Sequence, residues 1–263
     1  MNINVVGMGI MGYQVSALFY LLGYNVAIYS NRGFNARLFD RQIKLQKKYI
    51  GCFTSSSKEL KVCSNISEIY DACTIETTKE DINIKKNLYE EVQKVTSNIF
   101  FTNTSSIEPR EIGSNVVGLH FFNPIHLKLV ELTKTQTEGP ELVRIINDIK
   151  SVGFDIIEVK GNRGYLANYI LFNEIGGAMK LIEEHGYSYK SIKSIYGHIY
   201  NGRDIFSILD IIGLDVSLSI FKYINEKDPS IYVPLCLDKA INSGILGKKN
   251  KTSILDVLGK INK

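Results

Sequence analysis

Short apolar runs and longer amphipathic segments alternate along the first part of the chain. Residues 3–6 form an apolar run of strand length, and residues 11–22 have the length and composition of a helix that ends before Gly23. A second apolar run, Asn25–Tyr29, predicts another strand, and the charged residues 34–49 follow with helical periodicity. The chain is therefore expected to begin with the order strand, helix, strand, helix.

The same alternation continues to about residue 160. Further strands are predicted at residues 73–76, 99–102, 116–122, 127–133 and 155–159, and a helix is predicted over residues 83–96. Strands that alternate with helices build a mostly parallel sheet covered by helices on both faces, because a parallel crossover needs a connecting element. The predicted fold class is α/β, with a doubly wound, Rossmann-like N-terminal domain.

After residues 160–164 the pattern changes to helices alone. Helices are predicted over residues 165–184, 188–200, 204–225 and 234–242. We therefore place two domains, residues 1–162 and an all-helical second domain of residues 163–263. The Lys-rich tail after Gly247 is expected to fray.

The helical domain has long apolar stretches for its size. Residues 166–182 and 205–220 are largely apolar, in a domain of only about 100 residues. A domain this small cannot cover all of that surface by itself, and exposed apolar helix faces of this extent mark an interface. We therefore expect a homodimer.

Composition and charge exclude several classes of function. The net charge is +4 without a block of five basic residues, which disfavours nucleic acid as a partner and suits an anionic small substrate. No apolar run reaches the roughly 18 residues of a membrane span, and residues 3–6 lack the basic leader of a signal peptide. The four cysteines (Cys52, Cys63, Cys73 and Cys236) contain no CxxC pair, so we expect no metal site and a reduced, cytoplasmic location.

A glycine-rich turn follows the first predicted strand. In the stretch from Gly7 through Gly9, Ile10 and Met11 to Gly12, the first glycine permits a tight turn and the second lets backbone approach a pyrophosphate. The third lets the helix pack closely on the strand, and the N–H groups of that helix then face the phosphates. The position between a strand and a helix predicts a dinucleotide site; the alternative is a glycine-rich turn in a doubly wound fold without a cofactor.

The end of the second strand bears on the choice of dinucleotide. An NAD site usually has an Asp or Glu there, which binds the ribose 2′-hydroxyl. This chain has Ser30, Asn31 and Arg32, so no carboxylate repels a 2′-phosphate and a guanidinium is available to bind one. These residues favour NADP over NAD as the cofactor, unless Arg32 is merely a solvated loop residue.

A histidine and a glutamate eleven residues apart carry the candidate chemistry. His120 lies in one apolar run and Glu131 in the next, and Pro124 marks a turn that lets the runs fold back on each other. An imidazole held by a carboxylate is a general acid/base suited to neutral pH. A satisfied core histidine is the alternative. With a dinucleotide site upstream, the pair predicts a dehydrogenase that moves a hydride and a proton.

At this point the chain resembles the 3-hydroxyacyl-CoA dehydrogenases over nearly its whole length. The resemblance rests on the glycine loop and on the strings NTSSI at residues 103–107, GLHFFNP at residues 118–124 and GLD at residues 213–215. It implies a Rossmann-like N-terminal domain, a helical C-terminal dimerisation domain and a cleft between them. It also implies hydride transfer between the dinucleotide and the 3-position of an acyl thioester.

The resemblance further implies roles for four residues. His120 exchanges a proton with the substrate hydroxyl, Glu131 orients His120, and Ser105 and Asn168 hold the substrate oxygen by neutral hydrogen bonds. Two of these residues have a structural alternative. Ser105 could instead cap a helix that starts near Ile107, and Asn168 could be a partnered amide in an apolar helix.

The resemblance also implies further cofactor contacts. Glu76 and Glu80 match a Glu-rich stretch after the fourth strand of the family, and Lys85 matches a lysine that follows it, near the nicotinamide ribose. Asn103 is grouped with these cofactor-binding residues. The alternative for Lys85 is an exposed helix residue.

Departures from the family concern the substrate more than the reaction. The chain has one residue fewer between NP and KLVE, Arg163-Gly164-Tyr165 where Pro-Gly-Phe is usual, GRDIFSILD (202–210) for MGPFELLD, and GKKNKT (247–252) for GKKTGEGFY. The substrate is therefore either an acyl-CoA or a short acyl group on an acyl carrier protein, as in secondary metabolism. A free hydroxy acid, and a non-catalytic dinucleotide-binding module, remain as alternatives.

Overall fold

The computed structural model describes residues 1–263 except 52–57, 134–138, 161–164, 203 and 262–263. The chain divides into two compact units, Met1–Tyr165 and Leu166–Lys263. The boundary predicted between residues 162 and 163 lies outside the described residues. No helix of the described residues is long and apolar enough to cross a membrane.

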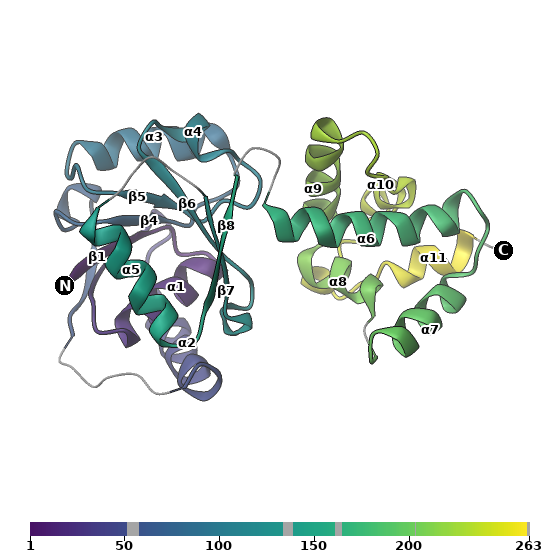
Figure 1. Ribbon diagram of the computed structural model, residues 1–263, viewed down its shortest axis with the longest axis horizontal. Coiled ribbons are helices and arrows are strands. Elements are labelled where there is room, and N and C mark those ends of the chain that lie inside the picture. The colour runs from purple at the N-terminus through teal and green to yellow at the C-terminus, as the bar shows by residue number, and fades with distance from the viewer. Residues whose placement is uncertain (52–57, 134–138, 161–164, 203, 262–263) are drawn as a thin grey trace. The chain divides into compact units, whose positions relative to one another are not determined.

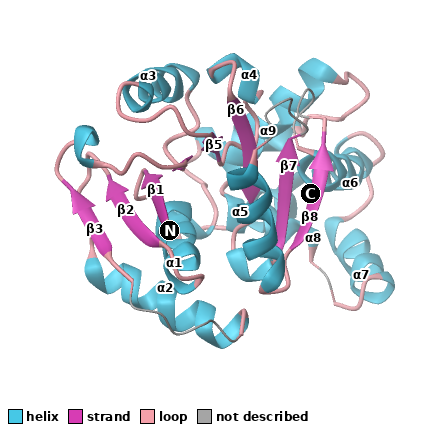
Figure 2. Cartoon of the chain, turned by 60° about the vertical axis from the view of Figure 1, so that its left-hand side comes forward, coloured by secondary structure: helices cyan, strands magenta, loops and turns pink. Residues whose placement is uncertain are grey.

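The first unit is built on an eight-stranded sheet with the order β3-β2-β1-β4-β5-β6-β7-β8 (Figures 1 and 2). The strands are β1 (Asn2–Val6), β2 (Asn25–Tyr29), β3 (Leu60–Cys63), β4 (Thr74–Glu76), β5 (Phe100–Thr102), β6 (Val116–Phe121), β7 (Leu129–Thr133) and β8 (Asp155–Val159). Neighbouring strands from β3 to β6 are parallel, β7 is antiparallel to β6, and β8 is parallel to β7. The predicted α/β class with a Rossmann-like, mostly parallel sheet is confirmed.

Helices cover both faces of this sheet. They are α1 (Ile10–Leu21), α2 (Ala36–Tyr49), α3 (Ile82–Gln93), α4 (Pro109–Ile112) and α5 (Pro140–Ser151). Strand β2 illustrates why the sheet needs helices on both faces. Val26 and Ile28 belong to a core shared with α1, α2 and α5. Ala27, which lies between them and points to the other face, belongs to a core shared with α3 and α4. Apolar side chains on both faces of a strand require a helix layer on each side.

The second unit contains helices without a sheet among its described residues. These are α6 (Leu166–Glu183), α7 (Tyr189–Ile199), α8 (Ile205–Ile212), α9 (Leu214–Lys227), α10 (Leu235–Asn242) and α11 (Leu255–Ile261). They enclose a core in which the rings of Phe172 and Phe221 meet edge to face, with centroids 4.8 Å apart. The predicted all-helical C-terminal part is therefore confirmed.

Several sequence predictions in the helical unit and the sheet were wrong or incomplete. The single helix predicted over residues 204–225 is two helices, α8 and α9, because Gly213 between them has a φ of +100°. The tail does not fray as predicted, because Ile254 and Leu258 are fully buried. The backbone of Ile254 also donates to the buried carboxylate of Asp210 over 2.7 Å. Strand β3 and helix α5 were not predicted.

Candidate active site

The glycine loop connects β1 to α1 as its spacing predicts. Gly7 has a φ of +96°, and a Cβ there would lie 2.9 Å from the backbone of Thr77. At Gly12 a Cβ would collide with the backbone of Gly7, so only glycine allows this close approach of helix and strand. A Cβ at Gly9 would instead meet nothing within 4 Å, which leaves the middle of the loop open.

The N-terminus of α1 has the features of an anion site. No side chain caps the helix, and its first turn contains no acidic residue. Ile10, the first helical residue, is 69% exposed, and Met11 is half-buried. N–H groups at an uncapped helix start carry partial positive charge, so the loop and helix fit the pyrophosphate of a dinucleotide.

The turn after β2 places three polar residues at its surface. The Tyr29 hydroxyl donates to Asn31 Oδ1 over 2.8 Å, and the Arg32 backbone N–H donates to the Ser30 hydroxyl over 3.2 Å. Asn31 and Arg32 are exposed and Ser30 is half-buried. The turn thus presents hydroxyl, amide and guanidinium groups without a carboxylate among residues 30–33.

His120 and Glu131 are brought together by the sheet itself. They are direct cross-strand partners in the antiparallel pair β6–β7, and His120 Nδ1 lies 3.0 Å from Glu131 Oε2. Both are buried, with 7% and 1% of their surfaces exposed. A carboxylate at Nδ1 favours the tautomer and ring orientation with the N–H on Nδ1 and the lone pair on Nε2.

Two aromatic rings flank the imidazole. The rings of Phe122 and Tyr165 each have their centroid 4.7 Å from that of His120. Tyr165 is almost fully buried, and its hydroxyl lies against Gly118 of β6. A Cβ added at Gly118 would collide with this hydroxyl and would lie 2.6 Å from Thr133 Cγ2. These rings restrict how His120 can turn, so its orientation is set before any ligand binds.

Glu80 organises the backbone around Ser105. One oxygen of its carboxylate accepts from the Ser105 and Ser106 backbone N–H groups, each over 3.0 Å, and from the hydroxyls of Ser106 and Thr104. Partial burial would raise the pKa of this carboxyl, but the Lys85 ammonium and these hydrogen bonds outweigh burial and lower its pKa below 4.5. Glu80 is therefore an ionised group that shapes the 104–106 turn.

Lys85 is not an exposed helix residue. Its surface is 1% exposed, and Nζ lies 2.8 and 2.9 Å from the two carboxylate oxygens of the fully buried Glu76 and 3.5 Å from Glu80. Glu76 also accepts from the Thr102 hydroxyl over 2.6 Å. Lys85 is thus a cation shared by two carboxylates, that of Glu76 at the end of β4 and that of Glu80 in the turn that follows.

The turn after β5 has side-chain contacts to the backbone, made by Asn103 and Thr104. The Asn103 side-chain oxygen accepts from the backbone N–H of Phe121 over 2.8 Å, so Asn103 joins the end of β5 to the residue after His120. Ser105 does not cap a helix near Ile107 with Glu108 at the third position, because Thr104 accepts the Ile107 N–H and α4 begins only at Pro109. The predicted contacts of Asn103 with a cofactor and of Ser105 with a substrate remain predictions.

Asn168 belongs to the second unit. It is half-buried in the first turn of α6, and its predicted placement against His120 remains a prediction. The other histidines (His126, His185 and His198) are exposed, as expected for surface residues.

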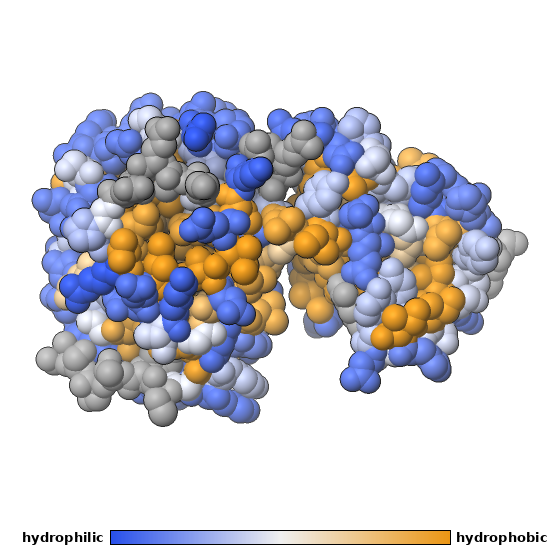
Figure 3. Space-filling view, viewed as in Figure 1, coloured by the Kyte–Doolittle hydropathy of each residue, from blue (hydrophilic) through white to orange (hydrophobic). Residues whose placement is uncertain are grey.

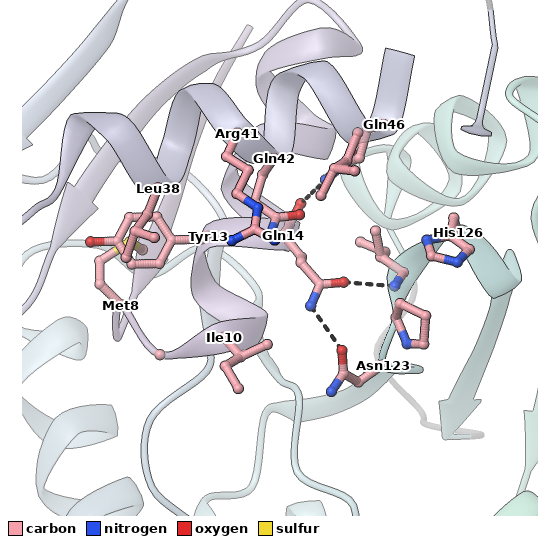
Figure 4. Close-up of a pocket in the computed structure, with 14 residues that line it drawn as sticks. Met8, Ile10, Tyr13, Gln14, Leu38, Arg41, Gln42, Gln46, Asn123 and His126 are labelled. Atoms are coloured by element: carbon pink, nitrogen blue, oxygen red, sulfur yellow. Dashed lines mark hydrogen bonds between the residues drawn. The ribbon is translucent and has the colours of Figure 1, made fainter. Parts of the chain in front are cut away.

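A network around Gln14 was missed at the sequence level. Gln14 is 4% exposed on α1 and lines a pocket of about 560 Å³ between the glycine loop, α2 and the turn that follows β6 (Figure 4). Its side chain bonds to Asn123 and to the backbone of Ile125. The available signal was a glutamine in an apolar helix, since a buried amide needs partners.

Comparison with known proteins agrees with these features. The family described as 3-hydroxyacyl-CoA dehydrogenase, NAD binding domain, matches residues 2–161. A 3-hydroxybutyryl-CoA dehydrogenase from Clostridioides difficile is 26% identical over 281 residues, which cover 97% of this chain and 99% of that protein. A mitochondrial hydroxyacyl-coenzyme A dehydrogenase from Sus scrofa is also 26% identical and covers 94% of this chain and 88% of its own length.

A solved structure shows the same fold. The crystal structure of an (S)-3-hydroxybutyryl-CoA dehydrogenase from Ralstonia eutropha matches with a TM-score of 0.81 and 23% identity, covering 96% of this chain and 97% of that one. At this identity the likeness concerns the fold alone.

Proposed function

The chain belongs to the 3-hydroxyacyl-CoA dehydrogenase family, and from this premise we propose that it transfers a hydride between NAD(P) and the 3-hydroxy/3-keto position of an acyl thioester. The observation that carries the proposal is the buried His120–Glu131 pair, with Nδ1 and Oε2 3.0 Å apart. A dinucleotide bound at the glycine loop would supply the hydride acceptor or donor. The protein then has to manage one proton at the substrate oxygen.

His120 is the general acid/base of the proposed reaction. Its Nε2 takes the hydroxyl proton as the carbonyl forms, and it returns a proton when the reaction runs toward the alcohol. Glu131 faces Nδ1 and stabilises the imidazolium that forms, and the aromatic rings of Phe122 and Tyr165 hold the ring in place. Each step balances, since one hydride and one proton leave or join the substrate together.

Ser105 and Asn168 are proposed to hold the substrate oxygen by hydrogen bonds. Support for Ser105 comes from its backbone, which Glu80 fixes over 3.0 Å. Glu80 and Lys85 shape the cofactor side of this turn through their ion pair. Because the Ser105 backbone is held in place, the position of its hydroxyl is restricted. A hydroxyl in a restricted position can orient the substrate oxygen by a hydrogen bond.

The acyl carrier is proposed to be coenzyme A, as in the names of the relatives, with an acyl carrier protein as the second candidate. The shortened turn after Pro124 and the changed residues 247–252 favour the second candidate, because they alter segments that the family has in a different form. Rates with acetoacetyl-CoA and with a panel of acetoacetyl carrier-protein thioesters would decide between them. Absence of oxidation or reduction with every thioester would refute the proposal and leave a free hydroxy acid or a non-catalytic module.

The preferred cofactor is proposed to be NADP. Support comes from the turn after β2, where Ser30 replaces a carboxylate and the exposed Arg32 can pair with a 2′-phosphate. The matching family domain is described as NAD binding, so a direct measurement matters. Calorimetry should give tighter binding of NADPH than of NADH, and Arg32→Ala should weaken NADPH binding by about 1.5–3 kcal/mol while leaving NADH unchanged. Equal or tighter NADH binding by the parent protein would refute this preference.

The assembly is proposed to be a homodimer formed by the helical unit. Hydrophobic side chains gather on the surface around α7 (Figure 3), where Ile195 and Ile199 are 55% and 66% exposed. Helix α6 adds Ile170 with 58% exposure. Apolar side chains of this size and exposure are typical of an interface rather than of a solvated helix face.

A further inference from the structure

Tyr13 links the helix that starts at the glycine loop to the start of α2. It follows Gly12 directly and lies in the first turn of α1 (Figure 4). The Tyr13 hydroxyl accepts from the backbone N–H of Asn35 over 2.8 Å, and only 8% of the Tyr13 surface is exposed. Asn35 caps α2, because its side chain accepts from the backbone N–H of Leu38. Tyr13 therefore fixes the backbone at the residue that caps α2.

The ring of Tyr13 also holds the residue before this cap. Its centroid lies 5.9 Å from that of Phe34, and the ring of Phe34 lies 5.7 Å from that of Phe39 on α2. Phe39 is buried and belongs to the core that α1 and α2 share. Residues 34 and 35 are thus attached to α1 by one aromatic contact and one hydrogen bond, both made by Tyr13.

The other end of the connection between β2 and α2 is held by the glycine loop itself. The backbone N–H of Gly7 donates to the carbonyl of Tyr29, the last residue of β2, over 2.9 Å. Between these two anchors, residues 30–33 form a turn in which the backbone N–H of the last residue donates to the carbonyl of the first over 3.1 Å. The turn that carries the guanidinium of Arg32 is therefore held at both ends by the loop and helix proposed to bind the pyrophosphate.

The chemistry of the cofactor makes this attachment important. NADP carries its 2′-phosphate and its pyrophosphate on the same ribose, so its covalent structure limits the distance between these two anions. A protein that binds both anions must hold its two anion sites at a matching distance. A turn that is already held at that distance binds the 2′-phosphate without the entropic cost of ordering loose residues. Tyr13 supplies this attachment at the α2 end of the turn.

We propose that Tyr13 is a positioning residue for the choice of dinucleotide, because it holds the turn that carries Arg32 where the guanidinium can bind the 2′-phosphate of NADP. Arg32 makes the contact, and Tyr13 acts through the backbone of residues 34 and 35. NADH lacks the 2′-phosphate, so its binding should depend much less on this attachment. The proposal rests on the proposed preference for NADP, whereas the hydrogen bond from Asn35 to Tyr13 is independent of it.

Tyr13→Phe tests this role, because it removes the accepting hydroxyl and keeps the ring. Calorimetry should give NADPH binding that is weaker by about fivefold or more and NADH binding within about twofold of the parent, because a charged hydrogen bond that must order its own turn loses affinity. In the Arg32→Ala background the same substitution should change NADPH affinity by less than about twofold, because the contact that it supports is already gone. The control Tyr20→Phe makes the same chemical change further along α1, where the ring packs on Phe39, and should leave both affinities within about twofold.

A role in stability alone predicts a different pattern. General loosening of α1 or α2 would weaken NADPH and NADH binding alike, since both dinucleotides use the glycine loop, and it would do so with or without Arg32. Equal losses for the two dinucleotides in Tyr13→Phe, or an undiminished NADPH loss in the Arg32→Ala background, would therefore overturn the proposal. A parent-like ratio of the two affinities in Tyr13→Phe would overturn it as well.

Hydrogen exchange tests the link without any cofactor. In Tyr13→Phe the Asn35 N–H loses its acceptor and should exchange about fivefold faster or more, whereas in Tyr20→Phe it should remain protected. Unchanged exchange in Tyr13→Phe would overturn the link. A parent protein that bound NADH as tightly as NADPH, with exchange behaving as expected, would refute the proposed cofactor preference and with it the role of Tyr13 in that choice.

Discussion

Replacing Lys85 by methionine should destabilise the first unit by about 3–5 kcal/mol, because it leaves a buried carboxylate without its cation. Glu76 is fully buried, and Lys85 Nζ contributes contacts of 2.8 and 2.9 Å to its two oxygens. The Thr102 hydroxyl would remain as a donor 2.6 Å away, which places the expected loss toward 3 kcal/mol. That is a large part of the 5–15 kcal/mol that holds a typical domain folded.

The matched double variant Lys85→Met/Glu76→Gln removes both charges together. A neutral pair of similar volume avoids the unpaired charge, and such replacements are often neutral in stability. The double variant should therefore recover at least half of the loss in the single variant. The coupling between the two residues in a double-mutant cycle should lie within about 0.5–3 kcal/mol, as for other contacting pairs.

Urea unfolding followed by far-UV circular dichroism measures these effects, since the chain has no tryptophan to report by fluorescence. Dinucleotide affinity of the double variant then separates two roles for Lys85. A purely structural ion pair predicts parent-like affinity, whereas a direct contact with the cofactor predicts weaker binding at recovered stability. A loss below about 1 kcal/mol in Lys85→Met, or a double variant as unstable as the sum of both single variants, would refute the reasoning.

Four further outcomes follow from the site and the assembly. His120→Gln should bind the dinucleotide normally and lose about 10²–10⁴-fold in turnover, and near-parent rates with a thioester would contradict its role. The Glu80 carboxyl has a lowered pKa, so its stabilisation is fully present above the ordinary pKa of a glutamate and is lost as the pH falls through the lower pKa of the folded state. The difference in Tm between the parent and Glu80→Gln should accordingly shrink below pH 4.5, and a constant difference would exclude this linkage. Gly118→Ala should cost about 1–3 kcal/mol in urea unfolding, because its Cβ meets Tyr165 and Thr133, and a neutral effect would mean that these side chains can move apart. Light scattering across a dilution series should give about twice the chain mass of 29.6 kDa, and a monomer mass throughout would mean no dimer forms.

Local patterns determined the order of elements and the main site features. The glycines at positions 7, 9 and 12 were recognisable because each satisfies a steric need between one strand and the next helix. His120 and Glu131 were predicted as a pair because one proline-containing turn joins their two apolar runs, and an antiparallel pair of strands places such residues opposite each other. Both features are formed by elements that are consecutive in the chain, so the sequence pattern alone was enough to predict them.

Elements with weak local signals needed the tertiary structure. The edge strand β3 is short and partly exposed, so its pattern does not stand out, and it forms because β2 offers a parallel edge. The tail after Gly247 looks polar and Lys-rich, yet Ile254 and Leu258 bury themselves in the core of the helical unit. The burial of these two side chains and the hydrogen bond from Ile254 to Asp210 order this segment, although its composition is polar.

The roles of Lys85, Glu80 and Gln14 are tertiary in origin. From the sequence, Lys85 could be an exposed helix residue, and only the folded chain brings Glu76 within 3 Å of its ammonium group. Glu80 reaches the 104–106 turn across 24 to 26 positions, and Gln14 reaches the turn after His120 across 109 and 111. The sequence determined the fold class and the pairing of His120 with Glu131, because those depend on local periodicity. The contacts of Lys85, Glu80 and Gln14 depend on which strands become neighbours, and a single chain's pattern does not encode that explicitly.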